Sequence, residues 1–453
     1  MHTADFDRTA LALACKRFQI DRRRALGRTS MVALTGLGAA ATPGPALGMA
    51  ARAVAQPADS GPLIVAAYPA LDRILKALEP DWTAKHPKTP IKIVSRSFGD
   101  HHAAITAALA TRKGLPDLMA VEFGYLARFA GSGALADLGP LLGRAGLLDG
   151  VIVPYAARQA RFGGRLLALP TDIGPGVTFY RDDLLATARV SPETFLESWE
   201  SFVDAGRRIR DATGARLVGH ARDLKDAIIR SGIQPGEGLY FDADGRPVVR
   251  SSRFERAFSL ARAARQADLD ARVPAWSNDW SEGLRRGGIA SQLTGAWFGG
   301  HLATWLAPST TGKWRSALLP GGAMTAWGGS FFAIPAGSPR KAEALELLKL
   351  IAFDPVRQID AFRRHDAFPA LLAAHDDPFF GEPLAFFGGQ RARMLWRDVA
   401  RKIVPISVHR LDPLADEIVN VELDRVLLRG KAVSSALADA QALLERRVAR
   451  ASR

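Results

Sequence analysis

From residue 62 onward, short apolar runs of strand length alternate with segments that have helical periodicity. The runs at 63–67, 91–94 and 118–121 are predicted to be strands. Between the first two runs, apolar residues recur at helical spacing, at Leu71, Ile74, Leu75, Leu78 and Trp82. Repeated β-α units of this length predict an α/β fold, with a parallel sheet that carries helices on both faces.

The carboxyl ends of the predicted strands carry polar and aromatic residues. Tyr68 follows the first strand, residues 95–100 follow the second, and Glu122 follows the third. In sheets of this kind, ligands bind at the carboxyl ends of the strands. These residues are therefore candidates for contact with a bound molecule.

The length of the chain indicates more than one lobe. A single hydrophobic core does not usually extend over 453 residues of globular composition. The β-α pattern breaks near residues 166–170, and the sequence beyond is less regular, with a helix around Trp199 and an Asp-Gly turn at 242–245. Two amphipathic helices are predicted later in the chain, at 344–351 and 433–444.

Residues 1–55 have the features of a secretory signal peptide. A basic cluster at 22–24 is followed by a short apolar run at 31–41 and by the small-residue cleavage site Ala-Val-Ala at 53–55. The paired arginines, with Leu26 three positions on, resemble the twin-arginine type of signal. We expect an exported, periplasmic protein.

The net charge does not indicate a nucleic-acid partner. The formal charge is +14, of which residues 1–55 contribute +5. The remaining +9 are spread over the rest of the chain without a run of lysines or arginines. Nucleic-acid binding requires such charges to be concentrated on one face, so we expect no nucleic-acid partner.

The sequence lacks the motifs of common catalytic and metal sites. It has no phosphate-binding loop, no H-E-x-x-H motif and no G-x-S-x-G elbow. The adjacent His101 and His102 would diverge on a helix, so they could not both bind one metal; we expect them in a loop or at the start of a helix. The single cysteine, Cys15, lies in the signal peptide. We therefore expect no catalytic residue, no metal and no cofactor. A glycosidase needs only two carboxylates at a suitable separation, so a secreted carbohydrate-active enzyme stays open as the alternative.

Six of the nine tryptophans lie between residues 276 and 327. Trp297 and Trp327 are flanked by glycines, which allow backbone to come close to a bound molecule. An indole offers a flat apolar face and one N–H donor, so the residues alone leave ligand binding and core packing equally open for this pair. Three others are predicted to pack in the core, namely Trp280, Trp305 and Trp314.

Several motifs occur in a fixed order along the chain. They are L-P-D-L-M at 115–119, G-R-L-L-A-L-P-T-D at 164–172, F-Y-R-D-D-L at 179–184, S-W-E-S-F at 198–202, W-G-G-S-F-F-A-I-P at 327–335, a leucine-rich helix at 342–350 and a terminal segment at 430–437. Together they resemble the extracellular solute-binding proteins of bacterial sugar ABC transporters, of the carbohydrate-binding family 1 type. The chain departs from the family pattern at Leu167, where an aromatic residue is customary, and at Arg165 and Arg181, where lysine is.

The resemblance implies a type II periplasmic-binding-protein fold. Two lobes, each a sheet flanked by helices, would close by hinge motion on a ligand in the cleft between them. The lobes would comprise residues 61–169 plus 315–370, and residues 170–314 plus 371–453. The resemblance also implies a monomer that captures a sugar or related small polar solute in the periplasm and delivers it to the permease subunits of an ABC importer.

The same resemblance implies a set of ligand contacts. Carboxylates can accept hydrogen bonds from two sugar hydroxyls, and indoles can cover sugar rings. For Glu122 and Asp172, capping of a helix or turn is the alternative role. The implied contacts are Tyr68, Glu122, Asp172, Trp297, Trp327, Gly328, Gly329 and Arg391.

Overall fold

A computed structural model describes residues 61–143, 148–234 and 236–451 of the chain. The predicted export signal at 1–55 lies outside these residues. In the described part, no helix is both long and apolar enough to span a bilayer.

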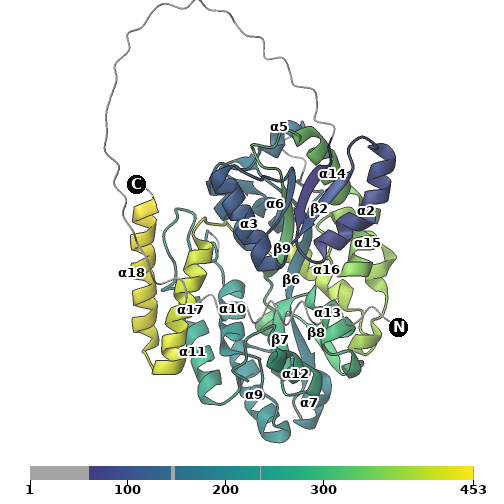
Figure 1. The fold of residues 1–453 in the computed structure, drawn as a ribbon. Helices are drawn as coiled ribbons and strands as arrows, with labels where there is room; N and C mark the ends of the chain where they lie inside the picture. The colour runs from purple at the N-terminus through teal and green to yellow at the C-terminus, as the bar shows by residue number, and fades with distance from the viewer. Residues whose placement is uncertain (1–60, 144–147, 235, 452–453) are drawn as a thin grey trace, which may run out of the picture. The chain divides into compact units, whose positions relative to one another are not determined.

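The three predicted strands form and pair in parallel, as expected. β1 (Leu63–Ala67) lies between β2 (Ile91–Ser95) and β3 (Leu118–Glu122). The helix α2 (Leu71–Lys85) connects β1 to β2, and α3 (Phe98–Thr111) connects β2 to β3. Figure 1 shows α3 on one side of these strands and α2 on the other. The side chains of β1 and β3 are mostly buried, which explains why their sequences are continuous apolar runs.

The rest of the sheet is antiparallel, which the β-α pattern did not predict. β9 (Ala326–Ala333) lies between β3 and the long strand β6 (Leu169–Arg181) and is antiparallel to both. β7 (Ser291–Gly295) and β8 (Trp314–Ala317) pair with the second half of β6. The break that the sequence shows near residues 166–170 is therefore the start of the strand that joins the two halves of the sheet.

Helices make up most of the remaining chain. The predicted helices at 344–351 and 433–444 are confirmed as parts of α14 and α18. A short hairpin consists of β4 (Arg161–Phe162) and β5 (Arg165–Leu166). The other helices are α4 (Phe123–Gly131), α5 (Leu138–Leu142), α6 (Pro154–Gln159), α7 (Asp182–Thr187), α8 (Pro192–Leu196), α9 (Trp199–Thr213), α10 (Ala221–Ser231), α11 (Ser252–Gln266), α12 (Asn278–Arg286), α13 (Phe298–His301), α14 (Lys341–Phe353), α15 (Pro355–His365), α16 (Ala392–Lys402), α17 (Asp412–Arg429) and α18 (Val433–Ala451).

The buried apolar side chains form two clusters. The first surrounds β1 and β3, and the second surrounds α9, α10 and α11 together with α17 and α18. In Figure 1, α17 and α18 lie beside α11, against which both pack. The strand β6 contributes Phe179 to the first cluster and Tyr180 to the second, because successive side chains of a strand point to opposite faces. The lobe boundaries drawn from the sequence stay a prediction.

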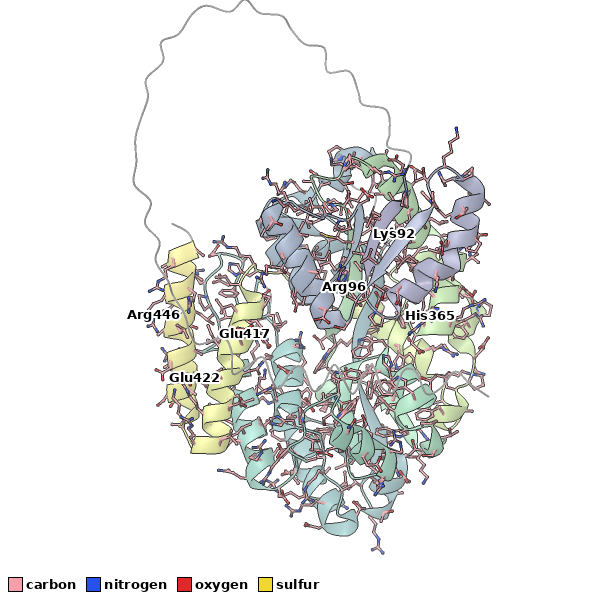
Figure 2. All side chains as sticks on the ribbon, viewed as in Figure 1. Lys92, Arg96, His365, Glu417, Glu422 and Arg446 are labelled. Carbon is pink, nitrogen blue, oxygen red and sulfur yellow. The ribbon has the colours of Figure 1, made fainter. Side chains whose placement is uncertain are left out.

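Charged side chains lie mostly at the surface. Figure 2 labels Lys92, Arg96, Glu417 and Arg446, all of which are exposed. Glu422 on α17 is an exception, with 5% exposure. Its carboxylate accepts a hydrogen bond from Lys431 at 2.6 Å, which compensates for its removal from water.

The prediction of core packing is correct for two tryptophans and wrong for the third. Trp280 and Trp314 are 1% and 0% exposed, whereas Trp305 is 42% exposed. Trp305 lies in the turn Leu302–Leu306, and its indole N–H donates to Nδ1 of His301 at 2.9 Å. Its ring rests on other aromatic side chains at the surface and is not enclosed by them.

We expect Trp314→Ala to lower the free energy of unfolding by about 3–5 kcal/mol, because the ring is fully buried. Its N–H also donates to Thr310 Oγ1 at 2.8 Å. The matched change Trp305→Ala should cost about 1 kcal/mol or less, since that residue is 42% exposed at the surface. Urea denaturation of both variants measures the difference. Equal losses would show that Trp305 packs in the core after all.

Candidate ligand-binding site

Three of the predicted site residues meet at Ser330 on β9. Ser330 is paired with Glu122 on β3 and with Asp172 on β6. Residues directly opposite each other on neighbouring strands point to the same face of the sheet, so the two carboxyls lie on either side of the serine. Tyr68, which follows β1, donates its hydroxyl to Ser330 Oγ at 2.8 Å. The sequence did not single out Ser330, although it lies directly after the predicted contacts Gly328 and Gly329.

Glu122 ends β3 and caps α4, so the alternative role that the sequence left open is present. Its Oε2 accepts the backbone N–H of Gly124 at 2.7 Å. Burial raises the pKa of Glu122 to about 7, and neighbouring Asp172 adds to this, while Gly124 and the guanidinium of Arg230 act in the opposite direction. The carboxyl is therefore both a helix cap and a group that titrates near neutral pH.

His102 holds the backbone of Glu122 in place through a hydrogen bond. The two histidines are the fourth and fifth residues of α3, near the helix start where the sequence allowed them, and both are buried. The backbone N–H of Glu122 donates to His102 Nε2 at 3.1 Å, and Nδ1 of His102 lies 2.9 Å from the carbonyl oxygen of Phe98. This arrangement requires the neutral ring with its proton on Nδ1. Burial lowers the pKa of His102 to about 4, so the ring stays neutral in ordinary buffers.

Asp172 carries an acceptor that the protein leaves unused. Burial raises the pKa of Asp172 to about 6, against hydrogen bonds from Ser330 that lower it. Its Oδ1 is buried and has no hydrogen-bond partner within the residues that the structure describes. A buried acceptor without a donor is costly, so this oxygen is suited to accept a hydrogen bond from a ligand hydroxyl.

Arg230 is a further charged group that the sequence did not reveal. It lies in the last turn of α10, with its guanidinium carbon 5.2 Å from the centre of the Trp327 ring. Its charge lowers the pKa of Glu122 and also that of Asp412, which burial raises to about 7. Nε of Arg230 is buried without a hydrogen-bond partner in the described chain. No local pattern distinguishes this arginine from others on amphipathic helices.

Trp297 and Trp327 are both half-buried and are joined by a hydrogen bond. The indole N–H of Trp297 donates to the backbone oxygen of Trp327 at 3.0 Å. A Cβ added at Gly174 would lie 1.9 Å from that oxygen, and one at Gly295 would lie 2.2 Å from the indole nitrogen. Glycine at these positions therefore lets β6 and β7 pack against the two tryptophans. The N–H of Trp297 is already used, so a ligand can meet only its ring.

Gly328 and Gly329 both have backbone conformations that favour glycine, with φ of 77° and 130°. A Cβ at Gly329 would also lie 3.1 Å from the backbone oxygen of Asp172. The two glycines thus fix the path of β9 between Trp327 and Ser330. Arg391 is exposed and precedes α16; within the described residues its side chain has no hydrogen bond or ion pair to the other predicted contacts.

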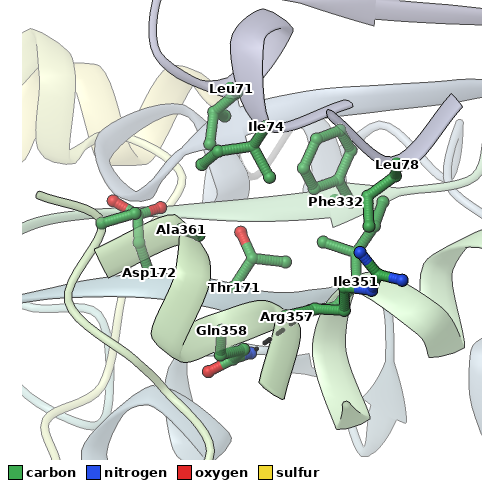
Figure 3. A pocket seen from close by; sticks show the side chains of 11 residues that line it. Leu71, Ile74, Leu78, Thr171, Asp172, Phe332, Ile351, Arg357, Gln358 and Ala361 are labelled. Carbon is green, nitrogen blue, oxygen red and sulfur yellow. Dashed lines mark hydrogen bonds between the residues drawn. The ribbon is translucent and has the colours of Figure 1, made fainter. Parts of the chain in front are cut away.

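A small cavity lies beside Asp172 (Figure 3). Its volume of about 20 Å³ can hold about one water molecule, which is far less than a sugar ring. The cavity therefore belongs to the packing around Asp172 and is not a ligand pocket. Its walls are mostly apolar and include Leu71, Ile74, Leu78, Phe332 and Ile351.

Comparison with known proteins gives a consistent result. The family model described as bacterial extracellular solute-binding protein matches residues 62–357. A lactose-binding protein of Rhizobium radiobacter is 29% identical over 352 residues, which cover 74% of this chain and 79% of the relative. An arabinooligosaccharide-binding protein of Bacillus subtilis (strain 168) is 26% identical over 307 residues, covering 61% and 69%.

The fold also matches solved structures. The ABC transporter associated binding protein from B. animalis subsp. lactis Bl-04, in complex with beta-1,6-galactobiose, has a TM-score of 0.70 at 23% identity, over 84% of this chain and 96% of that one. The predicted solute-binding-protein fold is thereby confirmed. Since the family model covers well over half of the sequence, the chain belongs to the bacterial extracellular solute-binding proteins.

Proposed function

We propose that this protein is the substrate-binding component of an ABC importer and that it captures a carbohydrate. The observation that carries the proposal is the group around Ser330, where two carboxyls, Glu122 and Asp172, flank a serine hydroxyl. Carboxylate oxygens are strong acceptors for sugar hydroxyls, and the unused Oδ1 of Asp172 lacks only such a donor. The names of the lactose-binding and arabinooligosaccharide-binding relatives support a sugar ligand.

In this proposal the ligand binds in a cleft between two lobes that close by hinge motion. Lobe boundaries at 61–169 plus 315–370 and at 170–314 plus 371–453 would place the crossings between the lobes at the start of β6, in β8 and near residue 370. Tyr68, Trp297, Trp327, Gly328 and Gly329 would then complete the contacts near the carboxyls. Arg391 would contact the ligand only if closure moved it toward this group. The protein would act as a monomer with permease subunits as partners, and without a nucleic-acid partner.

The proposal includes binding without turnover. The family consists of solute-binding proteins, and the relatives are named for binding. The glycosidase alternative requires two carboxyls, and Glu122 and Asp172 flank Ser330, so this alternative is tested directly. Incubation of lactose, galacto-oligosaccharides and arabino-oligosaccharides with the protein, followed by assay for new reducing ends, separates the two functions.

We expect Asp172→Asn to weaken sugar binding by about tenfold to a hundredfold, because hydrogen bonds to charged groups contribute about 1.5–3 kcal/mol. The matched control is Asp204→Asn on α9, whose side chain is 71% exposed and pairs with Arg207. Isothermal titration calorimetry of both variants measures the change. Unchanged affinity in Asp172→Asn, with the fold intact, would remove this carboxyl from the site.

The affinity should also depend on pH. The pKa values of Glu122 and Asp172 are raised to about 7 and about 6, so both carboxyls take up protons as the pH falls below neutral. If the ligand binds the ionised forms, binding releases protons and affinity falls from about pH 8 to about pH 5. Titrations across this range test the prediction, and Asp172→Asn should remove the lower of the two steps. A flat profile would contradict it.

The proposed location is the periplasm, reached by the twin-arginine route. We expect the mature protein to begin after Ala55, and replacement of Arg22 and Arg23 by lysine to stop export. N-terminal sequencing of the periplasmic fraction measures the first outcome, and immunoblots of fractionated cells measure the second. Export of the double variant at the normal level would exclude the twin-arginine route but not export itself.

A further inference from the structure

Three indole rings form a row that starts at Trp297. The rings of Trp297 and Trp276 are 6.1 Å apart between centroids and 15° from parallel. The ring of Trp305 continues the row at 6.4 Å from Trp276, with an angle of 23°. The three residues come from separate places, namely the loop before α12, the start of α13 and the turn after it. Neither Trp276 nor Trp305 belongs to the motifs on which the family resemblance rests.

Two members of the row are unusually exposed for tryptophan. Trp276 is 44% exposed and Trp305 is 42% exposed, whereas Trp280, which contacts Trp276 at 5.2 Å, is 1% exposed. Trp280 and Phe298 are buried beneath the row and fill the core at this point, so the core does not require the exposed rings. Large apolar groups that remain in contact with water, side by side, indicate a surface that is covered by something else.

Both exposed rings are held in place by specific features. Trp276 has a backbone φ of 69°, a conformation that is rare for a bulky residue and that is often found at ligand-binding sites. Trp305 lies in a π-helical turn, Leu302–Leu306, closed by a bond from the N–H of Ala307 to the oxygen of Leu302 at 3.0 Å. Such turns are frequent at functional sites. His301 Nδ1 accepts the indole N–H of Trp305 at 2.9 Å, which fixes the ring further.

The chemistry of the indole row favours a ligand whose rings have apolar faces. The N–H groups of Trp297 and Trp305 are both used within the protein, so a ligand can meet these indoles only through their apolar ring surfaces. Sugar rings have C–H faces that pack against indoles. Trp297, at one end of the row, is bonded to the backbone of Trp327, which lies on the same strand as Ser330, the residue paired with Glu122 and Asp172.

We propose that Trp276 and Trp305 form an extension of the binding site that holds the outer rings of an oligosaccharide of three or more sugars. This inference rests on the proposed function. The first rings would lie near the carboxyls and Trp297, and the next would lie on Trp276 and Trp305. The protein would accordingly select longer saccharides over single sugars and disaccharides.

The test compares ligands of increasing length. Calorimetry with galacto-oligosaccharides and arabino-oligosaccharides of one to four rings is performed on the wild type and on Trp276→Ala, Trp305→Ala and Trp276→Phe. In the wild type, each ring beyond the second should tighten binding, by about tenfold in total. Both alanine variants should lose this gain and bind disaccharides normally, and Trp276→Phe should retain most of it. Thermal melts on each variant confirm that it is folded.

Three outcomes would overturn the proposal, and they are distinguishable. If the wild type binds disaccharides and longer sugars equally, the extension does not exist but the sugar-binding function stands. If the alanine variants bind every sugar normally but no longer support uptake in cells, the row contacts the permease. If the wild type binds no sugar, the proposed function fails and the extension fails with it.

Discussion

The strand β9 pairs with β3 on one side and with β6 on the other, and the register of these two pairings places Ser330 between Glu122 and Asp172. A slip of one residue would turn each side chain to the opposite face of the sheet and separate the carboxyls from the serine. Irregularities in β6 between Pro170 and Asp172 and between Ile173 and Pro175 adjust this register locally. Bulges of this kind re-aim side chains next to functional sites.

The close contact between the two tryptophan segments is a second consequence of the β6–β9 pairing. Gly174 on β6 and Gly295 on β7 leave space for the hydrogen bond between Trp297 and the backbone of Trp327. Any side chain at Gly174 would collide with a backbone oxygen, which cannot move away as the end of a flexible side chain can. Gly295, one of the glycines beside Trp297 that the sequence suggested could admit a ligand, therefore serves to bring protein segments together.

The electrostatics of the site follow from the same geometry. Burial raises the pKa values of Glu122 and Asp172, and their mutual repulsion adds to the effect at Glu122. The positive charge of Arg230 partly offsets this rise in the pKa of Glu122. Arg230 lies on α10, whose apolar side chains belong to the second hydrophobic cluster. Oδ1 of Asp172 and Nε of Arg230 have no hydrogen-bond partner in the described chain. Both side chains interact electrostatically with Glu122. These unused groups indicate a polar ligand more directly than any motif does.

The sequence by itself determined the β-α units at the start of the mature chain, the helices α14 and α18, and the family, because local periodicity and ordered short motifs carry that information. It also identified Tyr68 and Glu122 as site candidates, since strand ends can be read locally, and Asp172 through the resemblance to the family. It missed Ser330 and Arg230 and misassigned Trp305, because exposure and neighbours depend on how distant segments pack. The bond from Tyr68 to Ser330 joins residues 262 positions apart, and the antiparallel insertion of β9 that creates it leaves no local pattern in the chain. Only the tertiary structure decided which strand lies between the two carboxyls and which indoles remain in contact with water.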